Sequence, residues 1–142
     1  MNATRRTVLI AGALSAITAL SFSSAVFAAS DLVEVQSLNA ANKPITVAVP
    51  KNPQRIAVAD FSVLDTLDHW GLGERIVALP QTTALPYLPQ YFKKSKKVTN
   101  LGTLKEIDLE GLMAAEPDVI FISGRLAKKY DELSKIAPVV FM

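Results

Sequence analysis

Two basic side chains, Arg125 and Lys128, closely follow residues 119–123, an apolar run rich in β-branched side chains. Such a run, without polar alternation, predicts a strand buried on both faces. Ligands of open α/β sheets bind outside the carboxyl ends of the strands. Because Gly124 ends the run and the two cations lie about one helical turn apart, the pattern predicts an anion contact. The alternative is that Arg125 is a solvated loop side chain.

Other residue patterns give little support for catalysis. The chain has no cysteine, which excludes disulfides, a thiol nucleophile, zinc–thiolate sites and a lipidated N-terminal cysteine. The single histidine, His69, stands beside Trp70 at an expected helix end, where packing or capping explains it better than catalysis. Asp60 follows an expected strand and could be a carboxylate at a switch point, although capping the next helix is its simpler role. Nucleophile-elbow, phosphate-loop and His-Glu-x-x-His motifs are absent from the sequence, so we expect no enzyme.

The first 28 residues have the three parts of a secretory signal peptide. Arg5 and Arg6 give a basic start, residues 8–22 an apolar stretch, and residues 26–28 a small-residue cleavage site. Polar serines within the stretch argue against an uncleaved membrane anchor. We therefore expect export to the periplasm of a bacterium with two membranes. The arginine pair also fits a twin-arginine signal, so the Sec and twin-arginine routes both stay open.

The net charge and length of the sequence after the predicted signal peptide indicate one small domain without net charge. Without Arg5 and Arg6, thirteen basic side chains balance thirteen acidic ones. This balance argues against nucleic acid or an anionic membrane surface as a partner. About 114 residues remain after the predicted cleavage, enough for one domain with one core, and we expect a monomer.

Strands and helices alternate along the remaining sequence. Residues 33–36 and 45–49 flank a turn-rich segment and predict an antiparallel hairpin that is half exposed to water. The buried strands that we expect after it are residues 55–59, 75–79, 119–123 and 139–142. Helical patterns between these strands predict an α/β fold, in which helices cover both faces of a parallel sheet.

Three helices are expected between the buried strands. Ser62 with Asp65 resembles a capping box at the start of the first, and Asp108 can cap a second helix that runs to Ala115. The expected buried positions are Val63, Leu67 and Trp70 on the first helix, Leu109, Leu112 and Met113 on the second, and Leu126, Tyr130, Leu133 and Ile136 on the third.

The connection between the second and third buried segments is expected to be irregular. Pro86 and Pro89 lie within residues 81–91 and predict a surface loop. A basic cluster follows this loop and is expected to be a solvated face. Its members are Lys93, Lys94, Lys96 and Lys97.

Three segments together resemble the periplasmic binding proteins of iron–siderophore and cobalamin ABC importers. They are residues 52–60 with 69–73, residues 101–103 with 107–110, and residues 115–120. In that family, two Rossmann-like lobes are joined by one long helix and hold the ligand between them. The resemblance implies a hairpin over residues 29–51 and the first lobe over residues 52–142. Because the sequence stops within an apolar run at Met142, we expect a longer protein.

The arrangement of Gly124, Arg125, Lys128 and Tyr130 resembles the branch of this family that binds ferric catecholate siderophores. In that branch an arginine and a lysine at this point help to clasp the anionic complex, so the resemblance implies this role for Arg125 and Lys128. It also implies a ligand contact by Tyr87, in the loop after the second buried strand. Catechol oxygens already saturate the iron, so we expect no metal ligands and no cofactor of the protein's own.

The expected function is that of the substrate-binding component of an iron–siderophore importer. Such a protein captures a ferric siderophore in the periplasm and delivers it to an inner-membrane ABC permease. One alternative ligand is cobalamin, haem or a hydroxamate siderophore, each of which needs fewer basic contacts. Another alternative is a module that only docks on a permease. Glu74, Glu106 and Glu110 are candidates for the contact, although a solvated surface charge is the simpler explanation of each. A small exported α/β enzyme is the remaining alternative.

Overall fold

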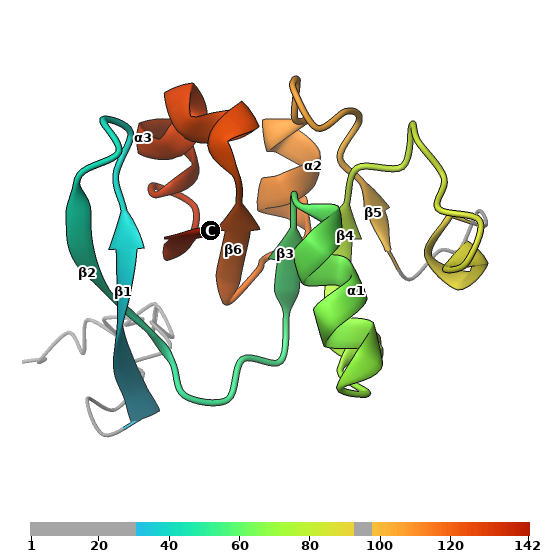
Figure 1. Ribbon diagram of the computed structural model, residues 1–142, viewed down its shortest axis with the longest axis horizontal. Helices are drawn as coiled ribbons and strands as arrows, with labels where there is room; N and C mark the ends of the chain where they lie inside the picture. The colour runs from blue at the N-terminus through green and yellow to red at the C-terminus, as the bar shows by residue number, and fades with distance from the viewer. Residues whose placement is uncertain (1–30, 93–97) are drawn as a thin grey trace, which may run out of the picture.

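The computed structural model describes residues 31–92 and 98–142. These residues form a five-stranded parallel sheet with flanking helices and a separate two-stranded antiparallel hairpin (Figure 1). The predicted α/β class with a preceding hairpin is therefore confirmed. The predicted signal peptide, residues 1–28, and the lysine cluster at residues 93–97 lie outside the described residues.

The hairpin consists of β1 (Leu32–Leu38) and β2 (Pro44–Pro50), whose register runs from Leu32 opposite Pro50 to Leu38 opposite Pro44. It covers one edge of the sheet. The buried hydroxyl of Ser37 accepts a 2.8 Å hydrogen bond from the N–H of Phe141 in the last strand. A free strand edge is a template for unwanted pairing, and the hairpin protects this one.

The parallel sheet has the strand order β5-β4-β3-β6-β7. Its strands are β3 (Ile56–Val58), β4 (Ile76–Leu79), β5 (Thr99–Asn100), β6 (Val119–Ile122) and β7 (Val139–Phe141). From β3 the chain proceeds outward to β4 and β5, then returns to β6 on the other side of β3 and ends at β7. The direction of winding therefore reverses between β3 and β6.

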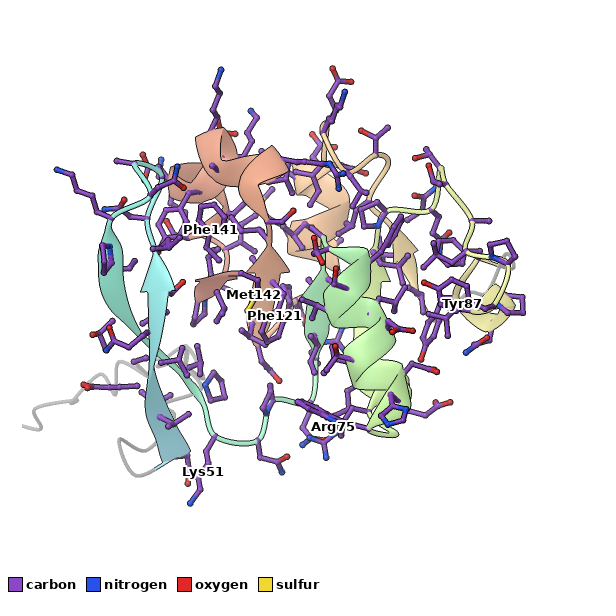
Figure 2. The ribbon with its side chains drawn as sticks, viewed as in Figure 1. Lys51, Arg75, Tyr87, Phe121, Phe141 and Met142 are labelled. Carbon is purple, nitrogen blue, oxygen red and sulfur yellow. The ribbon has the colours of Figure 1, made fainter. Side chains whose placement is uncertain are left out.

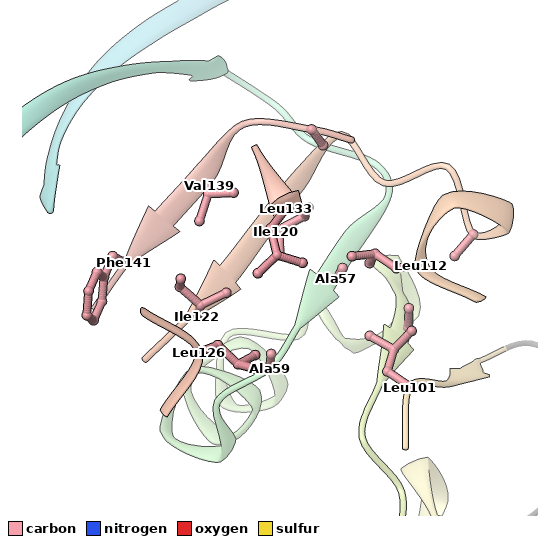
Figure 3. Close-up of a cluster of buried hydrophobic side chains, with 13 residues drawn as sticks. Ala57, Ala59, Leu101, Leu112, Ile120, Ile122, Leu126, Leu133, Val139 and Phe141 are labelled. Carbon is pink, nitrogen blue, oxygen red and sulfur yellow. The ribbon is translucent and has the colours of Figure 1, made fainter. Parts of the chain in front are cut away.

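Helices cover the sheet on both faces, as predicted. They are α1 (Phe61–His69), α2 (Leu109–Ala114) and α3 (Tyr130–Leu133), with short 3-10 helices η2 (Gly73–Arg75), η3 (Pro89–Tyr91) and η4 (Gly124–Lys129). Successive side chains of a strand point to opposite faces. Ile56 and Val58 pack in the cluster that contains α1. Ala57 belongs to the cluster beneath α2 and α3 (Figure 3).

The predicted start and buried face of α1 need correction. The cap is Asp60, not Ser62, because the Asp60 carboxylate accepts hydrogen bonds from the N–H groups of Ser62 and Val63. Trp70 was expected in the core but is 68% exposed. The helix ends at His69, Trp70 is its C-cap residue, and Gly71 follows at a positive φ of 73°. Val63 and Leu67 are buried as predicted.

The second helix confirms its predicted cap. The Asp108 carboxylate accepts a 3.0 Å hydrogen bond from the Gly111 N–H. Leu112 is fully buried and Leu109 packs partly against the core, but the expected burial of Met113 is wrong, since it is 53% exposed. The helix presents Leu112 to the sheet, and the adjacent position faces solvent.

The third predicted helix is mostly 3-10 helix. Only Tyr130–Leu133 is α-helical, and Gly124–Lys129 forms η4. Neither segment has a side-chain cap, and glycine disfavours an α-helical start. Leu126 is nevertheless buried, as is the helix α3 residue Leu133. Tyr130 and Ile136 pack partly against the same cluster, so the predicted buried positions are confirmed.

Charged side chains at the amino edge of the sheet are tied to the backbone. The Arg55 Nε donates to the carbonyls of Ala115 and Glu116 at 3.2 and 2.9 Å. The Asp118 carboxylate accepts from the N–H groups of Gln54 and Arg55 at 2.7 and 2.9 Å. These bonds join the start of β3 to the turn before β6. Arg55 and Asp118 belong to two of the three segments that carry the family resemblance.

The candidate ligand-binding edge

The switch point, where the direction of winding reverses, lies at the carboxyl ends of β3 and β6. The segments that follow these two strands leave the sheet toward opposite faces. Crevices at such points are the usual ligand sites of open α/β sheets. The strands stay paired up to the edge, since the Ala59 N–H donates to the Phe121 carbonyl at 2.8 Å. Asp60 follows β3, and the segment Ser123–Arg125 follows β6.

Asp60 is held as an ionised cap at this edge. Its Oδ1 accepts from the Ser62 N–H at 2.8 Å and from the Val63 N–H at 3.4 Å. Burial raises the pKa of the Asp60 carboxyl, but hydrogen bonds from Ser62, Val63 and the Ser123 side chain outweigh it, so the pKa lies below 3.8. The simpler of the two predicted roles, helix capping, is confirmed. The Ser123 side chain at the end of β6 thus influences a carboxylate at the end of β3.

Arg125 and Lys128 are both exposed on η4 at this edge. Neither forms a hydrogen bond or an ion pair with any part of the chain that the structure describes. The neighbouring Lys129 differs, because its Nζ binds the Glu132 carboxylate at 3.0 and 3.1 Å. Leu126 is 1% exposed and its N–H donates to the Ser123 carbonyl at 3.0 Å. The backbone around Arg125 is thus anchored while the guanidinium group is left available.

The two tyrosines that the resemblance links with these cations, Tyr130 and Tyr87, lie in different environments. Tyr130 packs partly against the core under the sheet. Burial and the nearby Asp131 carboxylate raise the pKa of its phenol. Tyr87 is 64% exposed in the loop between β4 and β5, at the end of the molecule remote from the hairpin (Figure 2). The structure therefore brings Arg125 and Lys128 together on one short helix and leaves Tyr87 on a separate loop.

An apolar groove beside the switch point was missed by sequence reasoning. Its volume is about 330 Å³, and it runs along α1 from Asp60 to Trp70, with Phe121 and Met142 also lining it. Figure 2 shows Phe121 and Met142 close together between the hairpin and α1. The sequence signal was Gly71, a helix-terminating residue directly after Trp70, which marks Trp70 as the cap residue of α1.

A second hollow, of about 350 Å³, lies at the other end of α1 and contains Asp68 and Tyr91. The Tyr91 hydroxyl donates to Asp68 Oδ1 at 2.6 Å. Burial, with the bond to Asp68 and that carboxylate's charge, raises the pKa of Tyr91. This pair joins the loop before β5 to α1.

Acidic and histidine side chains are scattered over residues 31–92 and 98–142 rather than clustered. In these ranges, three or more His, Cys, Asp or Glu side chains are nowhere grouped so that they could hold a metal ion. The helices of the same ranges are too short or too polar to cross a bilayer.

Residues 56–142 match the family of periplasmic binding proteins. The match covers more than half of the chain, and the chain belongs to this family. The predicted resemblance to the binding proteins of siderophore importers is confirmed by its relatives, and the predicted fold by their structures.

The chain is 42% identical over 94 residues to the petrobactin-binding protein YclQ of Bacillus subtilis (strain 168), covering 66% of this chain and 29% of YclQ. The crystal structure of YclQ gives a TM-score of 0.68 at 37% identity, covering 77% of this chain and 37% of that one. The ferric-anguibactin-binding protein FatB of Vibrio anguillarum is 28% identical over 92 residues, covering 65% of this chain and 28% of FatB.

The periplasmic catecholate-siderophore binding protein VctP from Vibrio cholerae is similar in structure, with a TM-score of 0.62 at 33% identity. That comparison covers 77% of this chain and 37% of VctP. The chain thus spans about a third of the length of these relatives.

Proposed function

We propose that the chain belongs to the substrate-binding component of an iron–siderophore ABC importer. It captures an anionic ferric siderophore of the catecholate class outside the cytoplasm, in the periplasm, and passes it to an inner-membrane permease. The observation that carries this proposal is the unpaired state of Arg125 and Lys128 beside the switch point, next to a paired Lys129. The names of YclQ, FatB and VctP support the ligand class.

The chemistry of the edge suits a compact trianion. A guanidinium group offers several directed donors to catecholate oxygens, and an ammonium group adds charge. Leu126 fixes the backbone between the two cations, so less conformational entropy is lost on binding. Tyr87 is exposed, and its ring can pack on a catechol or its hydroxyl can donate to the ligand. The iron is cargo whose coordination the siderophore completes.

The same observations make a binding protein a better proposal than an enzyme. Asp60 is already committed to capping α1, so it is poorly placed to exchange a proton with a substrate. His69 is exposed in the last turn of α1, where a basic side chain is favoured by the helix dipole. Cobalamin, haem and hydroxamate siderophores remain the alternative ligands, and they carry less negative charge for two cations to balance.

Contact with the permease is part of the proposal. Glu74, Glu106 and Glu110 are all exposed. Glu74 lies before β4 at the amino edge, whereas Glu106 and Glu110 lie after β5 at the carboxyl edge. They therefore belong to two different surfaces, and only Glu106 and Glu110 share the edge proposed for the ligand.

The test is binding of the ferric complex of a hexadentate tris-catechol chelator, measured by equilibrium dialysis. Arg125→Ala should weaken binding by about 1–3 kcal/mol, the range for charge-assisted hydrogen bonds, and Lys128→Ala should also weaken it. Lys129→Ala is the matched control, because it removes the same charge as Lys128→Ala from the adjacent position. Its binding should stay close to that of the unaltered chain. Unchanged affinity in Arg125→Ala would contradict the assignment.

A further inference from the structure

Four of the five glycines in the described ranges have a reason inside the fold. Gly71 and Gly102 have positive φ angles of 73° and 80°, a region that side chains with a Cβ disfavour. A Cβ at Gly73 would lie 1.9 Å from the Tyr91 hydroxyl, and one at Gly111 would lie 2.7 Å from an oxygen of the capping carboxylate. At each of these positions a Cβ would strain the backbone or require a neighbouring side chain to shift.

Gly124 has neither reason. Its φ lies outside the left-handed region, and a Cβ built on it meets nothing within 4 Å. Glycine also carries a cost here, since it weakens the start of a helix relative to alanine. The described residues therefore leave room for a Cβ atom at this position.

The position of Gly124 indicates why a residue without a side chain is found there. It stands between Ser123, whose side chain helps to lower the pKa of Asp60 across the switch point, and the unpaired Arg125. Glycine is the residue that lets a ligand come close to the backbone. A rigid complex with flat catechol rings needs such an approach if its oxygens are to reach the guanidinium group, because a wide ligand cannot bend around a side chain.

We infer that Gly124 is a contact position of the ligand, where the ferric siderophore packs directly on the peptide backbone beside Arg125. This inference rests on the proposed function and adds a requirement of shape to its requirement of charge. A side chain at residue 124 would hold the ligand away from Arg125 without altering any charge.

The experiment compares Gly124→Ala with Gly71→Ala. Both glycines have open space around an added Cβ, but Gly71 lies beyond the carboxyl end of α1, away from the switch point. Melting temperature and affinity for the ferric tris-catechol chelator complex are measured for both variants and for the unaltered chain. Gly124→Ala should keep or raise the melting temperature and weaken binding by about tenfold, or about 1.4 kcal/mol, within the usual cost of overpacking.

Gly71→Ala should show the reverse, with a lower melting temperature because of its positive φ and unchanged affinity. Wild-type affinity in Gly124→Ala, together with weak binding by Arg125→Ala, would overturn this inference and leave the proposed function intact. A clear loss of stability in Gly124→Ala would also overturn it, since the glycine would then have a reason inside the fold. Equal affinity of Arg125→Ala and the unaltered chain would overturn the proposed function itself.

Discussion

The two edges of the parallel sheet use their charged side chains in opposite ways. At the amino edge, Arg55 and Asp118 bind backbone groups, and Arg75 donates to Asn52 Oδ1 at 2.6 Å. At the carboxyl edge, Arg125 and Lys128 are exposed and bind nothing in the described parts of the chain. The contrast separates charges that hold the domain together from charges that remain available to a ligand.

The amino edge needs these charges because the start of β3 meets the end of α2 and the turn before β6 there. The last carbonyls of a helix have no partner within the helix, and at the end of α2 the Arg55 guanidinium supplies one. Glu116 stands there at a φ of 44°, and its carbonyl is one of the two acceptors. A parallel sheet brings distant segments together, and this edge is fastened by side chains rather than by tight turns.

The largest expected effect on stability comes from Arg55→Ala. It should lower the free energy of unfolding by about 2 kcal/mol, because two carbonyls lose a charged donor. Arg125→Ala removes the same charge from the other edge and should change stability by less than about 0.5 kcal/mol. Urea unfolding of both variants makes the comparison. Equal destabilisation by the two substitutions would remove the distinction between the edges.

Asp60 is the exception that sharpens the comparison, since it is a charged residue with a structural role at the carboxyl edge. Asp60→Ala should cost about 1 kcal/mol, as for other lost N-caps. Because folding lowers the pKa of Asp60, its stabilisation is complete above pH 3.8 and is lost as the pH falls through the lower folded value. Asp60→Asn should therefore flatten the acid limb of a stability curve measured by urea unfolding. An unchanged acid limb would show that the carboxylate contributes nothing.

The smallest expected effect belongs to Trp70→Ala. Since Trp70 is 68% exposed, its removal should change the free energy of unfolding by less than about 0.5 kcal/mol. A buried tryptophan would cost about 3–5 kcal/mol. Thermal unfolding distinguishes these values easily. A loss in the larger range would mean that Trp70 packs in the core, as its spacing along the helix predicts.

Local signals predicted the elements, and long-range contacts escaped prediction. Strands β3, β4, β6 and β7 follow from their apolar runs, and Arg125 with Lys128 from their position after one of them. The strand β5 is two residues long and has no pattern to detect. The predicted capping box at Ser62 was wrong, whereas the capping role of Asp60 was confirmed; both are good capping residues and lie only two positions apart.

The remaining features depend on residues that are far apart in the sequence. The bond from the Phe141 N–H to Ser37 and the influence of the Ser123 side chain on the pKa of Asp60 have no local signature. The function of Gly124 was likewise hidden, because a glycine after a strand is explained locally as a turn. Only the empty space around its backbone, together with an ordinary φ, separates it from the structural glycines.

The most direct test of the ligand-binding edge is a nuclear magnetic resonance titration of the chain with the ferric tris-catechol chelator complex. High-spin iron broadens nearby backbone signals, and the gallium complex of the same chelator is the diamagnetic control. We expect broadening of Asp60, Gly124 and Arg125 at the carboxyl edge, while Arg55 and Asp118 at the amino edge stay sharp. Broadening centred on the amino edge, or equal at both edges, would contradict the account.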